Sequence, residues 1–184
     1  MLKDLSKIVQ LGDAADLLVG YPFRSTCTPG EQGVLTCFLK DVDSSGVLNV
    51  PALKRVEEAS PNESHFANEG DVVFRSRGTS FVAAVVPKVH EPILVAAPMI
   101  LIRARRNMIL PEFIVWSING AYGETFFKEH AKGTGIPLIS KGVLEKMPLK
   151  LPSIENQQKI IDLVNLNKKE QFLKEKKEYF IYQM

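Results

Sequence analysis

The apolar positions of the chain change their spacing once, near residue 110. Before that point they gather in short runs of strand length, and after it they recur at helical spacing. The four clearest runs are DVVFRSRG (71–78), FVAAVV (81–86), ILVAA (93–97) and MILIRAR (99–105). Prolines separate these runs, and proline is confined to the ends and edges of strands. The pattern predicts a meandering, mostly antiparallel sheet.

The first third of the chain has a weaker pattern. Ile8–Leu11 is a short apolar run, and a helical turn or a strand is expected to follow through residues 17–19. Residues 24–33 and 57–70 are rich in small, polar or acidic residues, which predicts surface loops, and residues 34–39 between them have strand composition.

The last third of the chain predicts helices. Pro111 suits the first turn of one helix, and residues 123–133 suit a second that ends at a glycine. Ser140 can cap a further turn, and residues 147–152 form a proline-flanked strand before a long terminal helix. The predicted fold class is therefore α+β: a mixed, mostly antiparallel sheet domain with short helices, followed by a long C-terminal helix.

The terminal helix is expected to begin after Ser153, which suits an N-cap, and Glu155 lies favourably in its first turn. No glycine or proline interrupts the chain from there to Tyr182. At about 1.5 Å per residue, such a helix would span about 45 Å. Its first half has a broad apolar face, and its second half has a narrower one.

A seven-residue repeat runs along the terminal helix. Its apolar positions are Leu163, Leu166, Leu173 and Phe180. Glu170 and Lys177 interrupt the repeat, so the heptad pattern is weak. Two alternatives stay open: the helix packs on its own domain, or it pairs with another chain as an intermolecular coiled coil.

Length and composition narrow the class of protein. The 184 residues suffice for one domain with a core and one extension. The 23 basic and 21 acidic residues give a net charge of +2, which neither requires nor excludes nucleic acid, because a local basic patch is what binds phosphates. The N-terminus has no apolar signal segment and no apolar run is long enough to span a bilayer, so a cytoplasmic location is expected.

The sequence has none of the familiar catalytic motifs. A P-loop, a nucleophile elbow, a zinc-protease motif and the asparagine-proline-proline-aromatic motif of amino-group DNA methyltransferases are all missing. Cys27 and Cys37 are ten positions apart and the histidines are scattered, so two reduced, mostly buried thiols are expected and no metal site. The chain is therefore predicted to be non-catalytic, with no cofactor of its own.

Basic residues accompany small hydroxyl residues at the ends of several predicted elements. Arginine and lysine bind phosphates, and arginine also recognises guanine edges. The five residues predicted to face DNA are Arg24, Ser25, Arg75, Arg77 and Lys132. Two alternatives compete with nucleic-acid binding: Arg75 and Arg77 could pair with the acidic residues 57–69, and Arg103 and Arg105 could form a solvated strand face.

Three stretches, in this order, resemble the specificity subunits of type I restriction–modification systems. They are LGDAADLLVGYPFRS (11–25), EGDVVFRSRGTS (69–80) and ISKGVLEKMPLKLPSIENQQKI (139–160). The likeness covers nearly the full length and corresponds to one target-recognition domain, expected at 1–152, and one spacer helix, expected at 153–184. The typical subunit of that family carries two of each in tandem, whereas this chain carries one.

The resemblance implies a function without chemistry in this chain. Its recognition domain would bind one half of a split DNA site, and modification subunits would bring S-adenosylmethionine and methylate adenine, with or without a restriction subunit. A half-length chain would supply the second half-site by forming a homodimer through the terminal helix. Two other functions stay open: an orphan or truncated interaction protein that docks on modification subunits without specifying a site, and a small enzyme whose site no motif marks.

Overall fold

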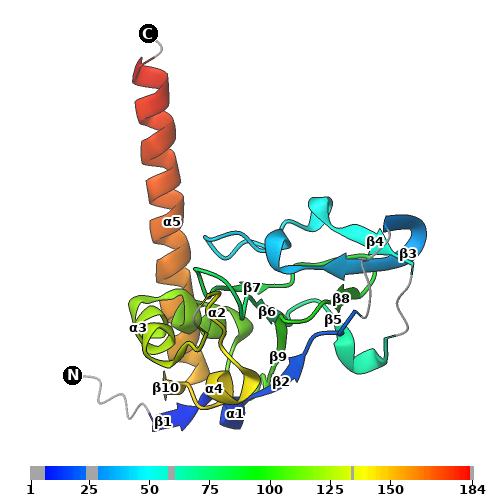
Figure 1. Ribbon diagram of the computed structural model, residues 1–184. Coiled ribbons are helices and arrows are strands. Elements are labelled where there is room, and N and C mark those ends of the chain that lie inside the picture. The colour runs from blue at the N-terminus through cyan, green and yellow to red at the C-terminus, as the bar shows by residue number, and fades with distance from the viewer. Residues whose placement is uncertain (1–6, 24–28, 58–60, 134, 183–184) are drawn as a thin grey trace.

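The computed structural model describes residues 7–23, 29–57, 61–133 and 135–182, with only the backbone described for 29, 31 and 178–182. Sheets and short helices form a body from which one long helix, α5 (Ile154–Tyr182), projects with the C-terminus at its far end (Figure 1). This is the predicted α+β class with a long terminal helix. No described helix has both the length and the apolar character needed to cross a membrane.

A four-stranded antiparallel sheet divides the interior into two cores. Its strands, in spatial order, are β2 (Ala15–Val19), β9 (Ile100–Ala104), β6 (Val72–Phe74) and β7 (Ala83–Val85). Val72 and Phe74 belong to one core and Val73 to the other, because successive side chains of a strand point to opposite faces. Both faces are buried, which explains why these strands appear in the sequence as continuous apolar runs.

The second sheet is mixed. Its strands, in spatial order, are β4 (Lys54–Val56), β3 (Pro29–Cys37), β8 (Ile93–Val95) and β5 (Phe66–Ala67). Only β3 and β8 run parallel. The predicted single meander is therefore wrong in its connections, because β8 and β9, which follow each other in sequence, belong to different sheets.

Two segments predicted as loops contain strands. β3 begins inside residues 24–33, where Val56 pairs with both Pro29 and Val34 across a bulge. A side-chain carbon at Gly33 would come within 2.4 Å of the Val56 backbone, so the glycine permits this close approach. The segment 57–70 likewise contains β5 and a 3₁₀ turn at Glu63–His65. The prediction missed these strands because small and polar residues give both segments the composition of loops.

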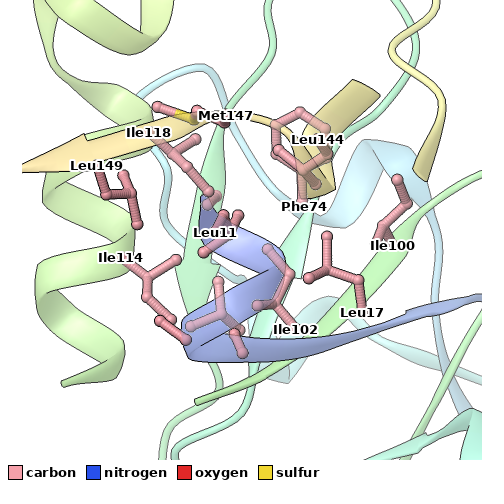
Figure 2. Close-up of a cluster of buried hydrophobic side chains, with 14 of the residues drawn as sticks. Leu11, Leu17, Phe74, Ile100, Ile102, Ile114, Ile118, Leu144, Met147 and Leu149 are labelled. Carbon is pink, nitrogen blue, oxygen red and sulfur yellow. The ribbon is translucent and has the colours of Figure 1, made fainter. Parts of the chain in front are cut away.

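Short helices and a two-stranded ribbon close the larger core. They are α1 (Leu11–Ala14), α2 (Pro111–Asn119), α3 (Ala121–His130) and α4 (Lys141–Glu145), with β1 (Lys7–Gln10) paired to β10 (Pro148–Leu151). Figure 2 shows Leu11, Ile114 and Leu144, from three of these helices, in the same buried cluster as Phe74 of the sheet. The remaining 3₁₀ turns are Leu39–Asp41 and Val50–Ala52.

The cap predictions are confirmed. The Ser140 hydroxyl accepts a hydrogen bond from the Val143 amide at 3.4 Å, and the Ser153 hydroxyl accepts one from the Asn156 amide at 3.3 Å. α3 begins two residues before its predicted start and ends at His130, before the predicted Gly133. Gly123 lets it pack tightly on the end of α2. A side-chain carbon at Gly123 would lie 2.1 Å from the Ile118 carbonyl oxygen.

Cys37 matches the prediction of a buried, reduced thiol. It is 0% exposed and forms no disulfide. Burial, with a smaller contribution from the nearby Asp41 carboxylate, raises the pKa of its thiol from 9.0 to about 12. The thiol is therefore protonated and unreactive at neutral pH. Cys27 lies outside the described residues.

Asn119 completes the outer edge of the first sheet. Its side-chain oxygen accepts from the Ala83 amide at 2.8 Å, and its side-chain nitrogen donates to the Ala83 carbonyl at 2.9 Å. Asn119→Ala is expected to lower the free energy of unfolding by about 1–2 kcal/mol, because both backbone groups of a buried residue lose their partner. Urea denaturation measures this loss. Asn165→Ala, at an exposed position of α5, is the control and should change stability by less than about 0.5 kcal/mol; equal effects of the two changes would contradict the assignment.

Candidate nucleic-acid interface

Two of the predicted DNA-facing residues, Arg77 and Lys132, are brought together by a short antiparallel ribbon. Leu138 lies between them and forms an antiparallel bridge with each. We call residues 76–78, 132 and 136–139 the basic ribbon. Residues directly opposite each other in an antiparallel pair carry their side chains on the same face. Arg77, Leu138 and Lys132 therefore share one face, with the apolar side chain in the middle.

Backbone hydrogen bonds and buried neighbours fix the ribbon to the body. The Ile139 amide donates to the Ser76 carbonyl at 2.8 Å, and the Gly78 amide donates to the Pro137 carbonyl at 3.0 Å. Ile139 is 0% exposed within the larger core. Ser76 is 1% exposed, and its hydroxyl donates to the Pro98 carbonyl. Successive residues of a strand point to opposite sides. Because Ile139 and Ser76 point into the body, their neighbours Leu138 and Arg77 point outward.

The cations of the basic ribbon are available to a partner. Arg77 and Lys132 are both exposed, and neither forms an ion pair with a described residue. Their backbones are separated by two strand spacings, which places them about 10 Å apart. Within the described part of the chain, the two charges are thus unpaired, on either side of a leucine.

Arg75 is held differently from Arg77. It is half-buried, and its Nη1 donates to the Val42 carbonyl at 3.0 Å. Its Nε is buried and has no hydrogen-bond partner among the described residues. Arg75 therefore joins the strand end to the turn at Val42, rather than to the acidic segment considered above. Its predicted contact with DNA stays a prediction, and Arg24 and Ser25 lie outside the described residues.

The arginines around the end of β9 are already engaged. Arg103 pairs with Asp71 at 3.3 Å, and Arg105 pairs with Asp16 at 2.6 Å. Arg106 donates weakly to the Glu69 carbonyl at 3.4 Å. These side chains bind neighbouring strands and turns, while Arg105 and Asp16 stay exposed, so they form the solvated face that was one alternative, with its charges paired.

Gln157 fixes the start of α5 on the body. It is 0% exposed, and its side-chain oxygen accepts from the Leu110 amide at 2.9 Å. Its side-chain nitrogen donates to the carbonyls of Met108 at 2.9 Å and Pro152 at 3.0 Å. The first turn of α5 is thereby joined to the segment that leads into α2.

Beyond its first turns, α5 leaves the body. Ile161 is 6% exposed, whereas every described side chain from Asn165 to Lys177 is exposed. The predicted partner residues Leu163, Leu166 and Leu173 are 61%, 62% and 56% exposed, and the side chain of Phe180 lies outside the described residues. At about 100° per residue, these leucines lie about 120–200° around the helix from Ile161. The apolar seam therefore faces away from the body.

An apolar groove of about 600 Å³ lies beside α2 and α3. Ile8, Trp116 and Tyr122 line it and are 65%, 42% and 56% exposed. Within the described ranges, no three His, Cys, Asp or Glu side chains are close enough to hold a metal ion. The described surface thus offers three features to a partner: positive charge, apolar area and a projecting helix.

Comparisons with known proteins give matches only among solved structures. No family model and no curated protein matches the chain. The HsdS subunit of Thermoanaerobacter tengcongensis matches with a TM-score of 0.66 and 18% identity over 89% of this chain and 37% of that one. A chain from a structural study of assembly and conformational transition of the type I R-M system also has a TM-score of 0.66 and 18% identity. That match covers 89% of this chain and 38% of the other. The type I restriction–modification S subunit of M. genitalium has a TM-score of 0.56 and 13% identity, and the match covers 90% of this chain and 40% of that subunit.

These matches confirm the sequence resemblance at the level of the fold. Nearly all of this chain superimposes on part of a type I specificity subunit, although few residues are identical. The chain spans about two-fifths of the length of those solved chains. It therefore has the fold of one part of those longer chains.

Proposed function

We propose that this chain is a non-catalytic, sequence-specific DNA recognition subunit of a type I restriction–modification system, equivalent to one half of the usual specificity subunit. The observation that carries the proposal is the fold match to an HsdS subunit over 89% of the chain. The chain would read one half of a split site, and associated modification subunits would bind S-adenosylmethionine and methylate adenine in the cytoplasm.

The basic ribbon supplies the DNA-binding surface in this proposal. Arg77 and Lys132 bind phosphates, because both are exposed cations without a described ionic partner. Buried Ile139 and Ser76 hold the ribbon rigid, so little conformational freedom is lost on binding. Arg24, Ser25 and Arg75 complete the proposed surface.

The second half-site would come from a second copy of the chain. Leu163, Leu166 and Leu173 form an apolar seam that faces away from the body, and an identical helix is the simplest partner that buries it. Phe180 continues the seam in sequence. A two-fold homodimer would recognise an interrupted site with two identical, inverted halves.

A second candidate function is an orphan interaction protein that docks on modification subunits without specifying a site of its own. The groove lined by Ile8, Trp116 and Tyr122 favours it, since exposed apolar surface of this kind is typical of protein interfaces. DNA binding separates the two candidates, because only the recognition subunit needs contacts with phosphates.

Removing the ribbon cations tests the DNA-binding surface. Arg77→Ala and Lys132→Ala are each expected to weaken binding to duplex DNA and to reduce the slope of log affinity against log salt by about 1, because each loses one phosphate contact. Fluorescence anisotropy across a salt series measures both effects. Lys128→Ala is the matched control, because Lys128 already pairs with Glu124 at 2.7 Å on α3. If all three variants keep the slope of the unaltered chain, the ribbon is not the DNA-binding surface.

A further inference from the structure

Two exposed apolar side chains lie on the basic ribbon. Ile136 is 58% exposed and Leu138 is 38% exposed. Isolated exposed apolar residues are common on protein surfaces and need no explanation. These two differ because Leu138 stands between two exposed cations on one face. Apolar and positively charged groups are thus combined in one small area.

The dimensions of the ribbon suit the grooves of duplex DNA. The backbones that carry Arg77 and Lys132 are about 10 Å apart. The minor groove is about 6 Å wide and the major groove about 12 Å wide. Two flexible basic side chains with this separation can reach phosphates on the two edges of a groove. The apolar side chain between them then faces the base pairs.

Glycines flank the backbone next to Ile136, so no side chains widen this part of the ribbon there. Gly133 has a φ of +123°, a conformation that residues with side chains rarely adopt. A side-chain carbon there would lie 2.9 Å from the Ile136 carbonyl oxygen. At Gly135 the corresponding position has no neighbouring atom within 4 Å. The backbone beside Ile136 is therefore open at Gly135, and at Gly133 it approaches closely only because that residue is a glycine.

We propose that Ile136 and Leu138 make an apolar contact with bases of the DNA while Arg77 and Lys132 hold the flanking phosphates. The inference rests on the proposed function and deepens it, because it assigns to the ribbon a part in reading the sequence. The contact has two possible forms with the same chemistry. One is packing against a thymine methyl group in the major groove, and the other is a wedge between base steps in the minor groove.

Selection from a library of duplexes with a randomised core tests the contact on the full chain. Ile136→Ala is expected to reduce preference about tenfold at one or two base positions, because it removes a base contact. Its salt slope should stay unchanged, since no phosphate contact is lost. Leu138→Ala should reduce preference at the same or adjacent positions. Ile8→Ala is the matched control, because Ile8 is 65% exposed on β1 and lies outside the ribbon.

Modified DNA separates the two forms of the contact. If replacing thymine by uracil in the selected site weakens the unaltered chain but not Ile136→Ala, the contact is with the methyl group. If 2-aminopurine in the site brightens with the unaltered chain but not with Ile136→Ala, the contact is a wedge. If both alanine variants keep the full sequence preference, or weaken all sequences equally, the inference is wrong while DNA recognition stands. If the unaltered chain binds no duplex in the library, the proposed function fails together with it.

Discussion

Replacing Gln157 with leucine is expected to lower the free energy of unfolding by about 3–6 kcal/mol, because three partly buried backbone groups lose their hydrogen-bond partner at once. The side chain is 0% exposed and bonds to Leu110, Met108 and Pro152. Leucine has a similar size, so the loss is one of polar pairing rather than of volume. The first turn of α5 should also separate from the body before the sheets unfold.

Urea denaturation and limited proteolysis within α5 measure these two effects. Gln158→Leu is the matched control: Gln158 is the neighbouring residue, it is exposed, and among the described residues its side chain bonds only to Asp162 on its own helix. The control should change stability by less than about 0.5 kcal/mol. Equal stability and equal cleavage of the two variants would show that Gln157 does not anchor the helix.

In the proposed recognition of a split site, Gln157 would also affect the spacing between the two half-sites. In a homodimer joined through α5, the direction of this helix sets the distance between the two recognition surfaces. Gln157 fixes that direction at its origin, since it joins the helix to the segment before α2. A loosened anchor is therefore expected to relax the spacing between the two half-sites as well as to lower stability.

A second large effect, on dimer formation, is expected when the apolar seam of α5 is changed. A chain that carries Leu166→Glu together with Leu173→Glu should be monomeric where the unaltered chain is a dimer, with the dissociation constant raised about 1,000-fold or more. Each leucine contributes about 1.5–3 kcal/mol when buried, and the dimer loses four of them. Both positions are exposed in the single chain, at 62% and 56%, so the fold of the body should be unaffected.

Sedimentation velocity at micromolar concentration measures the change. A variant with Lys168→Gln and Gln171→Glu is the control, because it alters the net charge by the same amount at positions away from the seam. It should remain a dimer. An unaltered chain that sediments as a monomer would contradict the homodimer directly.

Much of the fold could be predicted from the sequence because the decisive signals were local. The change of period near residue 110 located the helices, and Ser140 and Ser153 cap the helices that they were predicted to cap. The pairing of β3 with β8 could not be predicted, since parallel pairing depends on distant segments. β5 was missed because two residues of strand lie within an acidic, turn-rich segment.

The candidate site was predicted only in part, because the sequence does not show which charges are paired. Arg77 and Arg103 follow similar apolar runs, yet Arg103 pairs with Asp71 and Arg77 pairs with no described residue. Arg77 and Lys132 are far apart in the chain, and Leu138 brings them together. A signal for this apolar centre was present in the sequence as an isoleucine and a leucine, Ile136 and Leu138, within a segment that its glycines mark as a loop.

Gln157 was also missed as an anchor. Its helical spacing from Ile161 places it on the apolar side of α5, where a polar residue needs a buried partner. That spacing is a usable signal. The partner itself, the segment before α2, could not be identified without the structure, because it depends on how the helix crosses the body.

In the proposed function, the chain specifies a DNA site for methylation. The most direct measurement is methylome sequencing of cells that express the chain together with its modification subunit, compared with cells that express the modification subunit alone. New adenine methylation is expected at an interrupted motif whose two halves are identical and inverted. A methylome that the chain leaves unchanged would contradict it.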